Sequence, residues 1–321
     1  MTGPPGTVRV GPAGRPPRAA VDVGSNSVRL LVAGADGRTL TRQMRITRLG
    51  AGVDATGHLD DEALARTLEA LADFRDVWVG HGVEDRVRIA ATSAVRDATD
   101  RDRFFAGVVE TTGVEAEVLS GEAEAALAYA GATGALDVDE PAMVLDVGGG
   151  STELVIGAPG GGVAASVSLQ LGCVRLTERL LSSDPPGPDE LAAAREEIVA
   201  RLDEAEQRLT AAGSSPRDAR SIVGVAGTAT TLGALHLGLE TYDPDRIHGT
   251  RVPAEALRDL SVELAATPAA GRAGMGPVQA GREDVIHGGA LIVAAVVGRW
   301  NHAQLVVSES DSLDGLVASL A

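Results

Sequence analysis

Apolar and polar residues alternate along the chain in blocks whose spacing separates strands from helices. Residues 19–34 hold two apolar runs joined by an Asp-x-Gly turn, which predicts a β-hairpin. Residues 60–80 carry apolar side chains at helical spacing behind a pair of aspartates, which predicts an amphipathic helix. The same reasoning predicts strands at 87–92 and 115–119 and helices at 99–110 and 121–132. Strands and helices alternate, as in an α/β protein.

The pattern of the first hairpin returns later in the chain. Residues 143–158 again read as apolar run, Asp-x-Gly turn and apolar run. Asp22 corresponds to Asp146 and Ser27 to Ser151, and each pair is 124 residues apart. A repeat at this spacing indicates a duplicated domain, so we expect two similar halves that face one cleft. Beyond it we expect a helix at 190–213, a strand at 221–227, a helix at 228–239 opened by threonine caps, a helix within 282–300, a strand at 304–308 and a short terminal helix.

Composition limits the kinds of partner. The 321 residues carry a net charge of −17, which argues against broad binding to nucleic-acid polymers because that needs a basic face. All 28 basic residues are Arg, so a phosphate would be held by guanidinium groups, backbone amides and a divalent cation. Cys173 is the only cysteine, so no internal disulfide forms. Without a secretion signal or a membrane-spanning apolar run, we expect a cytoplasmic protein that does not bind membranes.

The two hairpin tips carry the first candidate chemistry. Glycine lets backbone amides approach an anion closely, and successive N–H groups form an anion-binding nest. A plain hairpin turn explains the first tip equally well. The second tip has three consecutive glycines, more than a structural turn needs. The candidate phosphate-binding residues are Gly24, Ser25, Asn26 and Ser27 at the first tip, and Gly148, Gly149, Gly150 and Ser151 at the second.

Two acids flank the second tip. Asp146 and Glu153 are seven residues apart across the hairpin, so both carboxylates can converge near the tip. Mg²⁺ takes one or two carboxylates together with waters and phosphate oxygens, so the pair suits this ion. Solvated carboxylates on a hairpin edge are the alternative interpretation.

Two strand-to-helix junctions offer further anion sites. Gly227 and Thr228 stand where a strand meets a helix N-terminus, although an ordinary capped junction looks the same. Ser93 follows a buried strand, at the end where α/β proteins place ligands, and Arg96 could clamp a phosphate. The alternative for Arg96 is an exposed side chain paired with Asp97 or Asp100.

Residues 121–132 place two acids on the first turn of a helix. Glu122 and Glu124 project about 200° apart, so only one can face a cleft. That acid could act as general base on water. On spacing alone, two solvated acids are the favoured interpretation.

Six motifs in one order resemble the exopolyphosphatase and guanosine-pentaphosphate phosphohydrolase (Ppx/GppA) family. They are DVGSNSVRLLV, TSAVRDA, LDVGGGSTELVIG, LGCVRLTE, VAGTATTLGAL and GREDVIHGGALIV. The resemblance covers roughly residues 19–310. It implies two ribonuclease-H-like domains of the actin-like ATPase superfamily that flank a cleft. We expect a disordered arm at 1–18, an N-terminal domain at 19–125 plus 305–321, and a C-terminal domain at 126–304.

The resemblance also implies Mg²⁺-dependent hydrolysis of a terminal phosphoanhydride, and it is compatible with a homodimer. The family's Gly-x-Glu-Glu-Ala stretch matches residues 121–125, which implies Glu124 as the catalytic base. Asp146 and Glu153 match the metal-binding acids, and the glycine tips match the phosphate loops. Arg96 matches a phosphate-contacting Arg, whereas Arg29 and Arg282 are weaker matches.

Two departures from the family bear on the substrate. A Gly-Leu-Arg-Glu-Gly-like motif is replaced by Asp311, Ser312, Leu313, Asp314 and Gly315, so the usual Arg is absent. The extra helical domains of some members are also absent, which favours short polyphosphate chains or a nucleotide over a long processive channel. Guanosine-pentaphosphate hydrolysis, a phosphotransferase of the same superfamily and a non-enzymatic nucleotide-binding regulator are the alternatives.

Overall fold

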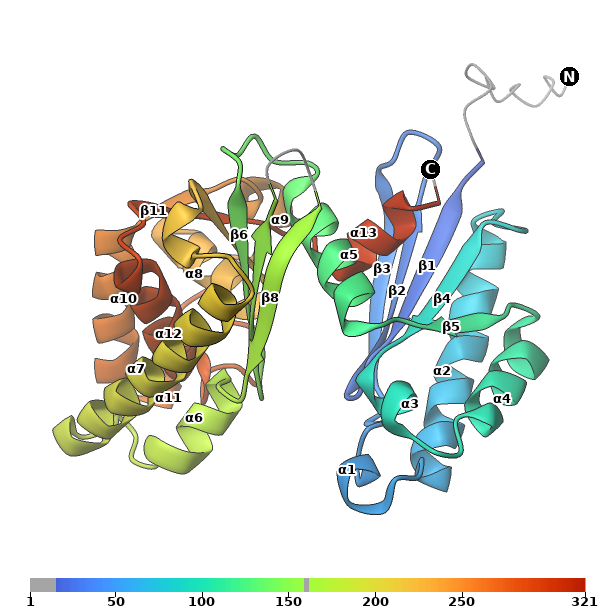
Figure 1. Cartoon of the computed structure of the whole chain (residues 1–321), viewed down its shortest axis with the longest axis horizontal. Coiled ribbons are helices and arrows are strands. Elements are labelled where there is room, and N and C mark those ends of the chain that lie inside the picture. Colours follow the sequence, from blue (N-terminus) through green and yellow to red (C-terminus); the bar gives the residue numbers. More distant parts are fainter. Residues whose placement is uncertain (1–15, 159–161, 321) are drawn as a thin grey trace, which may run out of the picture. The chain divides into compact units, whose positions relative to one another are not determined.

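The computed structural model describes residues 16–158 and 162–320. Its contacts divide the chain into a first unit, residues 1–121 with 316–321, and a second unit, residues 122–315. Figure 1 traces both with sequence colouring. Residues 1–15 of the arm expected at 1–18 lie outside the described residues, and Arg18 already belongs to the first strand.

The first unit is built on a five-stranded sheet in the order β3-β2-β1-β4-β5. Three strands form an antiparallel meander: β1 (Arg18–Val23), β2 (Ser27–Ala33) and β3 (Thr39–Ile46). Two more strands run parallel to β1: β4 (Val87–Ala91) and β5 (Ala116–Val118). One face of the sheet packs on α2 (Asp61–Gly80) and α4 (Asp102–Thr112), where Phe74, Trp78 and Phe104 are buried. Two short helices, α1 (Val53–Thr56) and α3 (Ser93–Asp97), complete it.

The second unit is built on a six-stranded sheet in the order β10-β11-β9-β6-β7-β8. Three strands form an antiparallel meander: β6 (Ala142–Val147), β7 (Thr152–Gly157) and β8 (Val163–Leu169). Two strands run parallel to β6: β9 (Ser221–Val225) and β11 (Gln304–Val307). At the edge, β10 (Arg251–Pro253) pairs antiparallel with β11. The two sheets share the order and directions of five strands. Even the register irregularities match, at Val32/Ala33 and Ile156/Gly157. The duplication predicted from the repeat is therefore confirmed.

Helices cover both faces of the second sheet. One face packs on α6 (Cys173–Leu180), α7 (Pro188–Ala211), α8 (Ala226–His236), α10 (Ala254–Ala266) and α12 (Ile286–Arg299). The other face packs on α5 (Gly121–Thr133), which buries Ala125, Tyr129 and Ala132. The remaining short elements are a 3₁₀ turn (Pro216–Asp218), α9 (Pro244–Ile247), α11 (Ala269–Ala273) and α13 (Ser312–Ala318).

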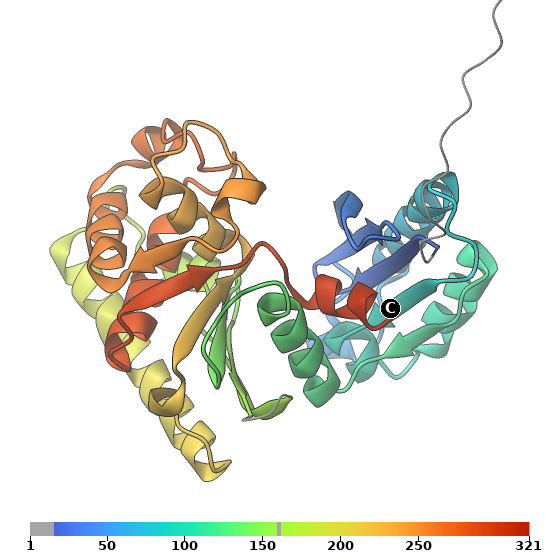
Figure 2. The same cartoon turned by 90° about the horizontal axis from the view of Figure 1, so that it is seen from above.

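Helices α5 and α13 touch through glycine. A Cβ on Gly131 would overlap the carbonyl oxygen of Asp311, and one on Gly315 would overlap that of Leu127. Only glycine permits such an approach of two backbones. Figure 2 shows the two helices side by side. The chain then re-enters the first unit, where Arg86 donates to the carbonyl of Leu320 and Arg88 to the hydroxyl of Ser319.

The two units have other bounds than the expected domains, and one helix begins differently from its prediction. Residues 305–315 were expected in the N-terminal domain, but β11 pairs with β9 and belongs to the second unit. The first unit ends at Gly121 instead of residue 125. Helix α8 begins at Ala226 with Val225 as its N-cap, so the threonines do not cap it.

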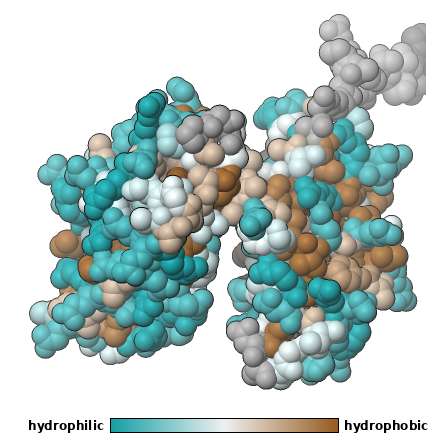
Figure 3. Space-filling view, in the orientation of Figure 1, coloured by the Kyte–Doolittle hydropathy of each residue, from teal (hydrophilic) through white to brown (hydrophobic). Residues whose placement is uncertain are grey.

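Among residues 16–158 and 162–320, no helix is long and apolar enough to cross a bilayer. Hydrophilic residues cover much of the face seen in Figure 3.

Candidate active site

The first glycine loop is a tight turn between β1 and β2. The amide of Gly24 donates to the carbonyl of Ser27 at 3.0 Å, which closes the turn. The hydroxyl of Ser25 lies 2.9 Å from that of Ser93 at the start of α3, so two predicted site residues from distant segments meet here. Asn26 is exposed, and its carbonyl accepts hydrogen bonds from the segment after β3.

The second glycine loop repeats this turn between β6 and β7. The amide of Gly148 donates to the carbonyl of Ser151, again at 3.0 Å. The carbonyls of Gly148 and Gly149 accept from amides at the start of α6, and the Arg175 side chain donates to the carbonyl of Gly150 at 2.8 Å. The loop is therefore fixed by its carbonyl groups and by the amide of Gly148, and the amides of Gly149 and Gly150 donate to no acceptor among the described residues.

Both loops present two consecutive amides without an acceptor. Within the described residues, the backbone N–H groups of Ser25 and Asn26 donate no hydrogen bond, and the same is true of Gly149 and Gly150. These two pairs occupy equivalent positions of the repeat, 124 residues apart. Consecutive free amides in a turn form an anion-binding nest. The two amide pairs are the observation from which an anion site can be argued, and binding of an anion at these tips stays a prediction.

The acid pair beside the second loop has a different counterpart in the first unit. Asp146 and Glu153 are cross-strand partners in β6 and β7, and at the equivalent positions Asp22 faces Arg29. Arg29 forms an ion pair with Asp22, so that site is neutralised internally. Like charges directly opposite on a sheet repel each other. The two copies therefore share the first acid but differ in its partner, a cation in one and a second acid in the other.

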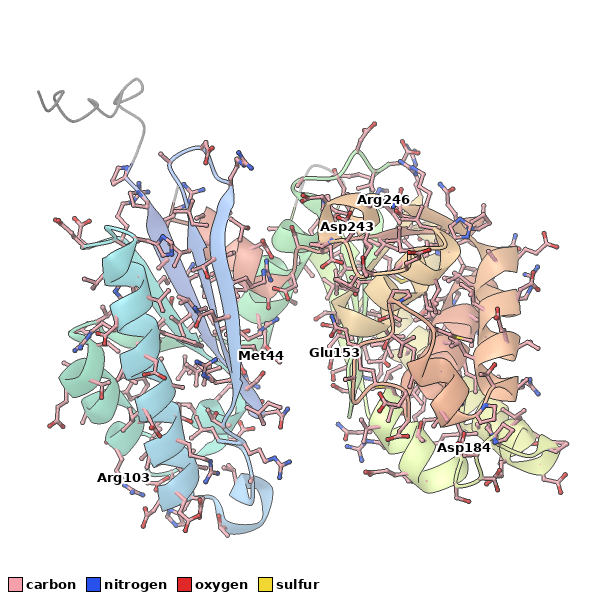
Figure 4. The ribbon with its side chains drawn as sticks, turned by 180° about the vertical axis from the view of Figure 1, so that it is seen from behind. Met44, Arg103, Glu153, Asp184, Asp243 and Arg246 are labelled. Carbon is pink, nitrogen blue, oxygen red and sulfur yellow. The ribbon has the colours of Figure 1, made fainter. Side chains whose placement is uncertain are left out.

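The surroundings of Glu153 suit a hard cation. The hydroxyl of Ser168 donates to a Glu153 carboxylate oxygen at 2.8 Å, and Figure 4 shows Glu153 on β7. In the described part of the chain no group of three or more His, Cys, Asp or Glu side chains could hold a metal ion. Two carboxylates without a complete protein cage match Mg²⁺, which keeps waters and phosphate oxygens in its shell.

The third predicted anion site is the start of α8, where Arg282 joins it. The Arg282 guanidinium lies directly against Gly227, because a Cβ on that glycine would overlap it. Thr228 is buried, and its hydroxyl donates to the carbonyl of Val147 at 3.2 Å, which ties α8 to the strand that leads into the second loop. Val225 is the N-cap of α8, and among residues 16–158 and 162–320 no side chain caps the first-turn amides of this helix.

Cys173 lies beside this cluster. Burial raises the pKa of its thiol, although the nearby Arg282 charge and a contact with Thr228 oppose the shift. The thiolate is the nucleophilic form of cysteine. A buried thiol with a raised pKa argues against a covalent mechanism through Cys173.

Arg96 has partners within its own unit. Its guanidinium donates to the carbonyl of Leu119 at 3.0 Å and lies 3.7 Å from the Asp97 carboxylate. The alternative pairing with Asp97 is thus present, whereas Asp100 accepts from the Leu59 amide and from Arg103, and these bonds lower its pKa. The Arg96 side chain is half-buried.

The two glutamates of α5 differ in exposure. Glu122 is exposed and Glu124 is half-buried on the first helical turn, as expected from their angular separation. Glu124 belongs to the same unit as Asp146 and Glu153. Its role as a base stays a prediction.

Gly172 fixes the second loop, so replacing it tests the loop geometry. A Cβ at this position would overlap the Gly149 carbonyl. We expect Gly172→Ala to displace the loop, to lower the free energy of unfolding by about 1 to 3 kcal/mol and to raise KM. Gly298→Ala is the control, because a Cβ added there would meet no atom of the described residues within 4 Å and Ala favours a helix. Urea unfolding measures the stability of both variants and steady-state kinetics measure their KM; an unchanged KM in Gly172→Ala would contradict the expected loop role.

Sequence reasoning missed some neighbours of the site. Asp22 corresponds to Asp146 in the repeat but was given no role, yet one of its carboxylate oxygens is buried and accepts no hydrogen bond from the described residues. Arg175 and Gly172 entered only as letters of a family motif. The Tyr242 hydroxyl donates to Glu309 at 2.6 Å near Arg282, and burial together with this bond raises its pKa. The signal for Asp22 was available in the repeat.

A duplicated five-strand core with the same tight glycine turn in each copy is the architecture of the actin-like ATPase superfamily, a class of phosphate-handling proteins. Within that class the chain belongs to the Ppx/GppA phosphatase family. The sequence model of this family matches residues 31–321. Membership identifies the protein as a phosphate-releasing hydrolase.

Individual relatives agree with this placement. The chain is 43% identical over 321 residues to Exopolyphosphatase 2 of Mycobacterium tuberculosis, covering 94% of this chain and 98% of the relative. The crystal structure of the Ppx/GppA phosphatase of Aquifex aeolicus in its type II variant superposes with a TM-score of 0.85 at 29% identity, covering 95% and 99%. A crystal structure described as an exopolyphosphatase-like protein gives 0.77 at 36% identity, covering 94% and 98%.

Proposed function

We propose that this protein hydrolyses the terminal phosphoanhydride of inorganic polyphosphate and releases orthophosphate, with short chains as preferred substrates. The observation that carries the proposal is the pair of equivalent loops, each with two consecutive amides that have no acceptor among the described residues. A relative of 43% identity named as an exopolyphosphatase supports the choice of polyphosphate.

The second unit supplies the residues for the divalent cation. Family membership implies a metal-dependent reaction, and the fit to Mg²⁺ comes from Asp146 facing Glu153. When bound, Mg²⁺ neutralises charge that develops on the phosphate oxygens. The two carboxylates are cross-strand partners next to the loop, so they would hold the ion beside the loop's free amides.

The remaining steps belong to side chains and amides of the protein. Glu124 accepts a proton from water, whose oxygen attacks the terminal phosphorus, and the bond to the bridging oxygen breaks to release a chain shortened by one phosphate. Loop amides, the guanidinium of Arg282 and that of Arg96 donate to the phosphate oxygens in the transition state. That both loops act on one substrate rests on the sequence repeat.

A side-by-side assay tests the proposal. Phosphate release is measured with Mg²⁺ from short polyphosphate, long polyphosphate, guanosine pentaphosphate and ATP, with a chelator as control. We expect the highest kcat/KM for short polyphosphate and no release with the chelator. Turnover of guanosine pentaphosphate alone would favour the nucleotide phosphohydrolase instead, and product that depends on an added acceptor would favour a phosphotransferase.

A further inference from the structure

A basic segment stands out in an acidic chain. The chain carries a net charge of −17, yet residues 37–53 contain four Arg and no acid. Many other guanidinium groups are ion-paired, for example Arg75 with Asp76 and Arg103 with Asp61. The segment comprises edge strand β3, where Figure 4 labels Met44, and the turn that follows it.

Backbone hydrogen bonds attach the end of this segment to the first glycine loop. The amides of Thr47 and Arg48 both donate to the carbonyl of Asn26, at 3.0 and 2.9 Å, and the amide of Gly50 donates to the carbonyl of Ser25 at 2.8 Å. The loop residues whose amides have no acceptor are therefore bonded, through their carbonyls, to the segment that carries Arg48. A Cβ on Gly50 would come within 2.7 Å of that of Ser25, so the two backbones are tightly packed.

Arg48 stands there in a strained backbone conformation. Its φ is 54°, and among the described residues only Ala226 and Asn301 are other non-glycine residues with positive φ. Ala226 directly precedes Gly227, so two of the three adjoin candidate phosphate loops. Glycine or Asn would form this turn with less strain. An Arg retained at such a position indicates a role for its side chain.

The Arg48 side chain is available to a ligand. It is exposed, and within the part of the chain that the structure describes its guanidinium makes no hydrogen bond or ion pair. Arg29, in contrast, is committed to Asp22. A guanidinium binds phosphate oxygens through two parallel N–H donors.

We propose that Arg48 is a substrate-contacting specificity residue, which binds a phosphate of the polyphosphate chain other than the one being released. The inference rests on the proposed function and extends it, because the first loop and Arg48 then bind successive phosphates of one polyanion. Arg48 raises affinity for chains and takes no part in bond cleavage.

Variants at Arg48 test this proposal against a matched control. Arg48→Gln removes the charge, Arg48→Lys keeps it, and Arg48→Gly removes the side chain while fitting the positive φ. Arg38→Gln is the control: Arg38 is exposed and lies at the other end of the eight-residue strand β3, about 25 Å away. Melting temperatures establish that each variant is folded.

We expect Arg48→Gln and Arg48→Gly to raise KM for short polyphosphate about tenfold with kcat within about twofold of wild type, as for loss of one charged hydrogen bond. Arg48→Lys should retain most of the affinity, and Arg38→Gln should match wild type. Orthophosphate, a product that carries a single phosphate, should inhibit wild type and Arg48→Gln with the same inhibition constant.

Three results would overturn the inference. The first is an equal KM for Arg48→Gln and Arg38→Gln. The second is a lowered kcat of Arg48→Gln at unchanged KM. The third is that Arg48→Gln weakens inhibition by orthophosphate as much as it weakens binding of polyphosphate. If wild type releases no phosphate, the proposed function fails by itself. Calorimetric titration of wild type and Arg48→Gln with tripolyphosphate then decides the inference separately, since equal affinities would overturn it and a loss of about tenfold would support it.

Discussion

Replacing Glu124 by Gln is expected to lower kcat for phosphate release by about 10³-fold, while KM for polyphosphate changes little. A general base contributes roughly 10²- to 10⁴-fold, and an amide cannot accept the proton of the attacking water. The substitution keeps the size of the side chain on the first turn of α5. Steady-state kinetics at saturating Mg²⁺, together with calorimetric binding of tripolyphosphate, measure both quantities.

Glu122→Gln is the matched control for this result. Glu122 lies two residues away on the same helical turn but is exposed, so its loss should leave kcat within about twofold of wild type. A Glu124→Gln variant that releases phosphate at the wild-type rate would remove Glu124 from the mechanism. Equal losses in the two variants would point to the charge of the helix terminus instead.

Removing either member of the Asp146–Glu153 pair is expected to change activity and stability in opposite directions. Asp146→Asn and Glu153→Gln should each lower phosphate release about 100-fold at a fixed, low Mg²⁺ concentration, because one cation ligand is lost. Without Mg²⁺ both variants should unfold at or above the wild-type temperature, since like charges on opposite strands cost up to about 1 kcal/mol.

Thermal melting with and without Mg²⁺ provides a readout besides activity. Mg²⁺ should raise the melting temperature of wild type and have a smaller effect on both variants, because only the intact pair binds the ion tightly. Glu196→Gln, which removes an exposed carboxylate on α7, should behave as wild type. If Mg²⁺ leaves the melting temperature of the wild-type protein unchanged, that result would contradict a cation site at Asp146 and Glu153.

The hairpins and the repeat could be predicted because their signals are local. Apolar runs on each side of an Asp-x-Gly turn specify a strand, a tight turn and a returning strand, and the structure has them at β1–β2 and β6–β7. The position of Asp146 opposite Glu153 also followed from spacing alone. The structure has tight turns at 24–27 and 148–151, as predicted, while the binding role of these residues stays a prediction.

Other features depend on contacts that spacing does not encode. β3 escaped prediction because Leu40, Met44 and Ile46 are exposed on an edge strand, so its apolar residues do not mark a buried face. The ion pair of Arg29 with Asp22 requires the strand register. The link from the loop to Arg48 joins segments more than twenty residues apart through backbone atoms, whose partners no side-chain pattern reveals.

The return of the chain into the first unit has a consequence for synthesis on the ribosome. The five strands of that unit are complete by Val118, but the carbonyl of Leu320 and the hydroxyl of Ser319, which receive Arg86 and Arg88, are translated some two hundred residues later. At about 5–20 residues per second, the nascent sheet waits on the order of tens of seconds for them. The unit whose strands are translated first is thus the unit whose last contacts form latest. These contacts can form only after the whole second unit has left the exit tunnel.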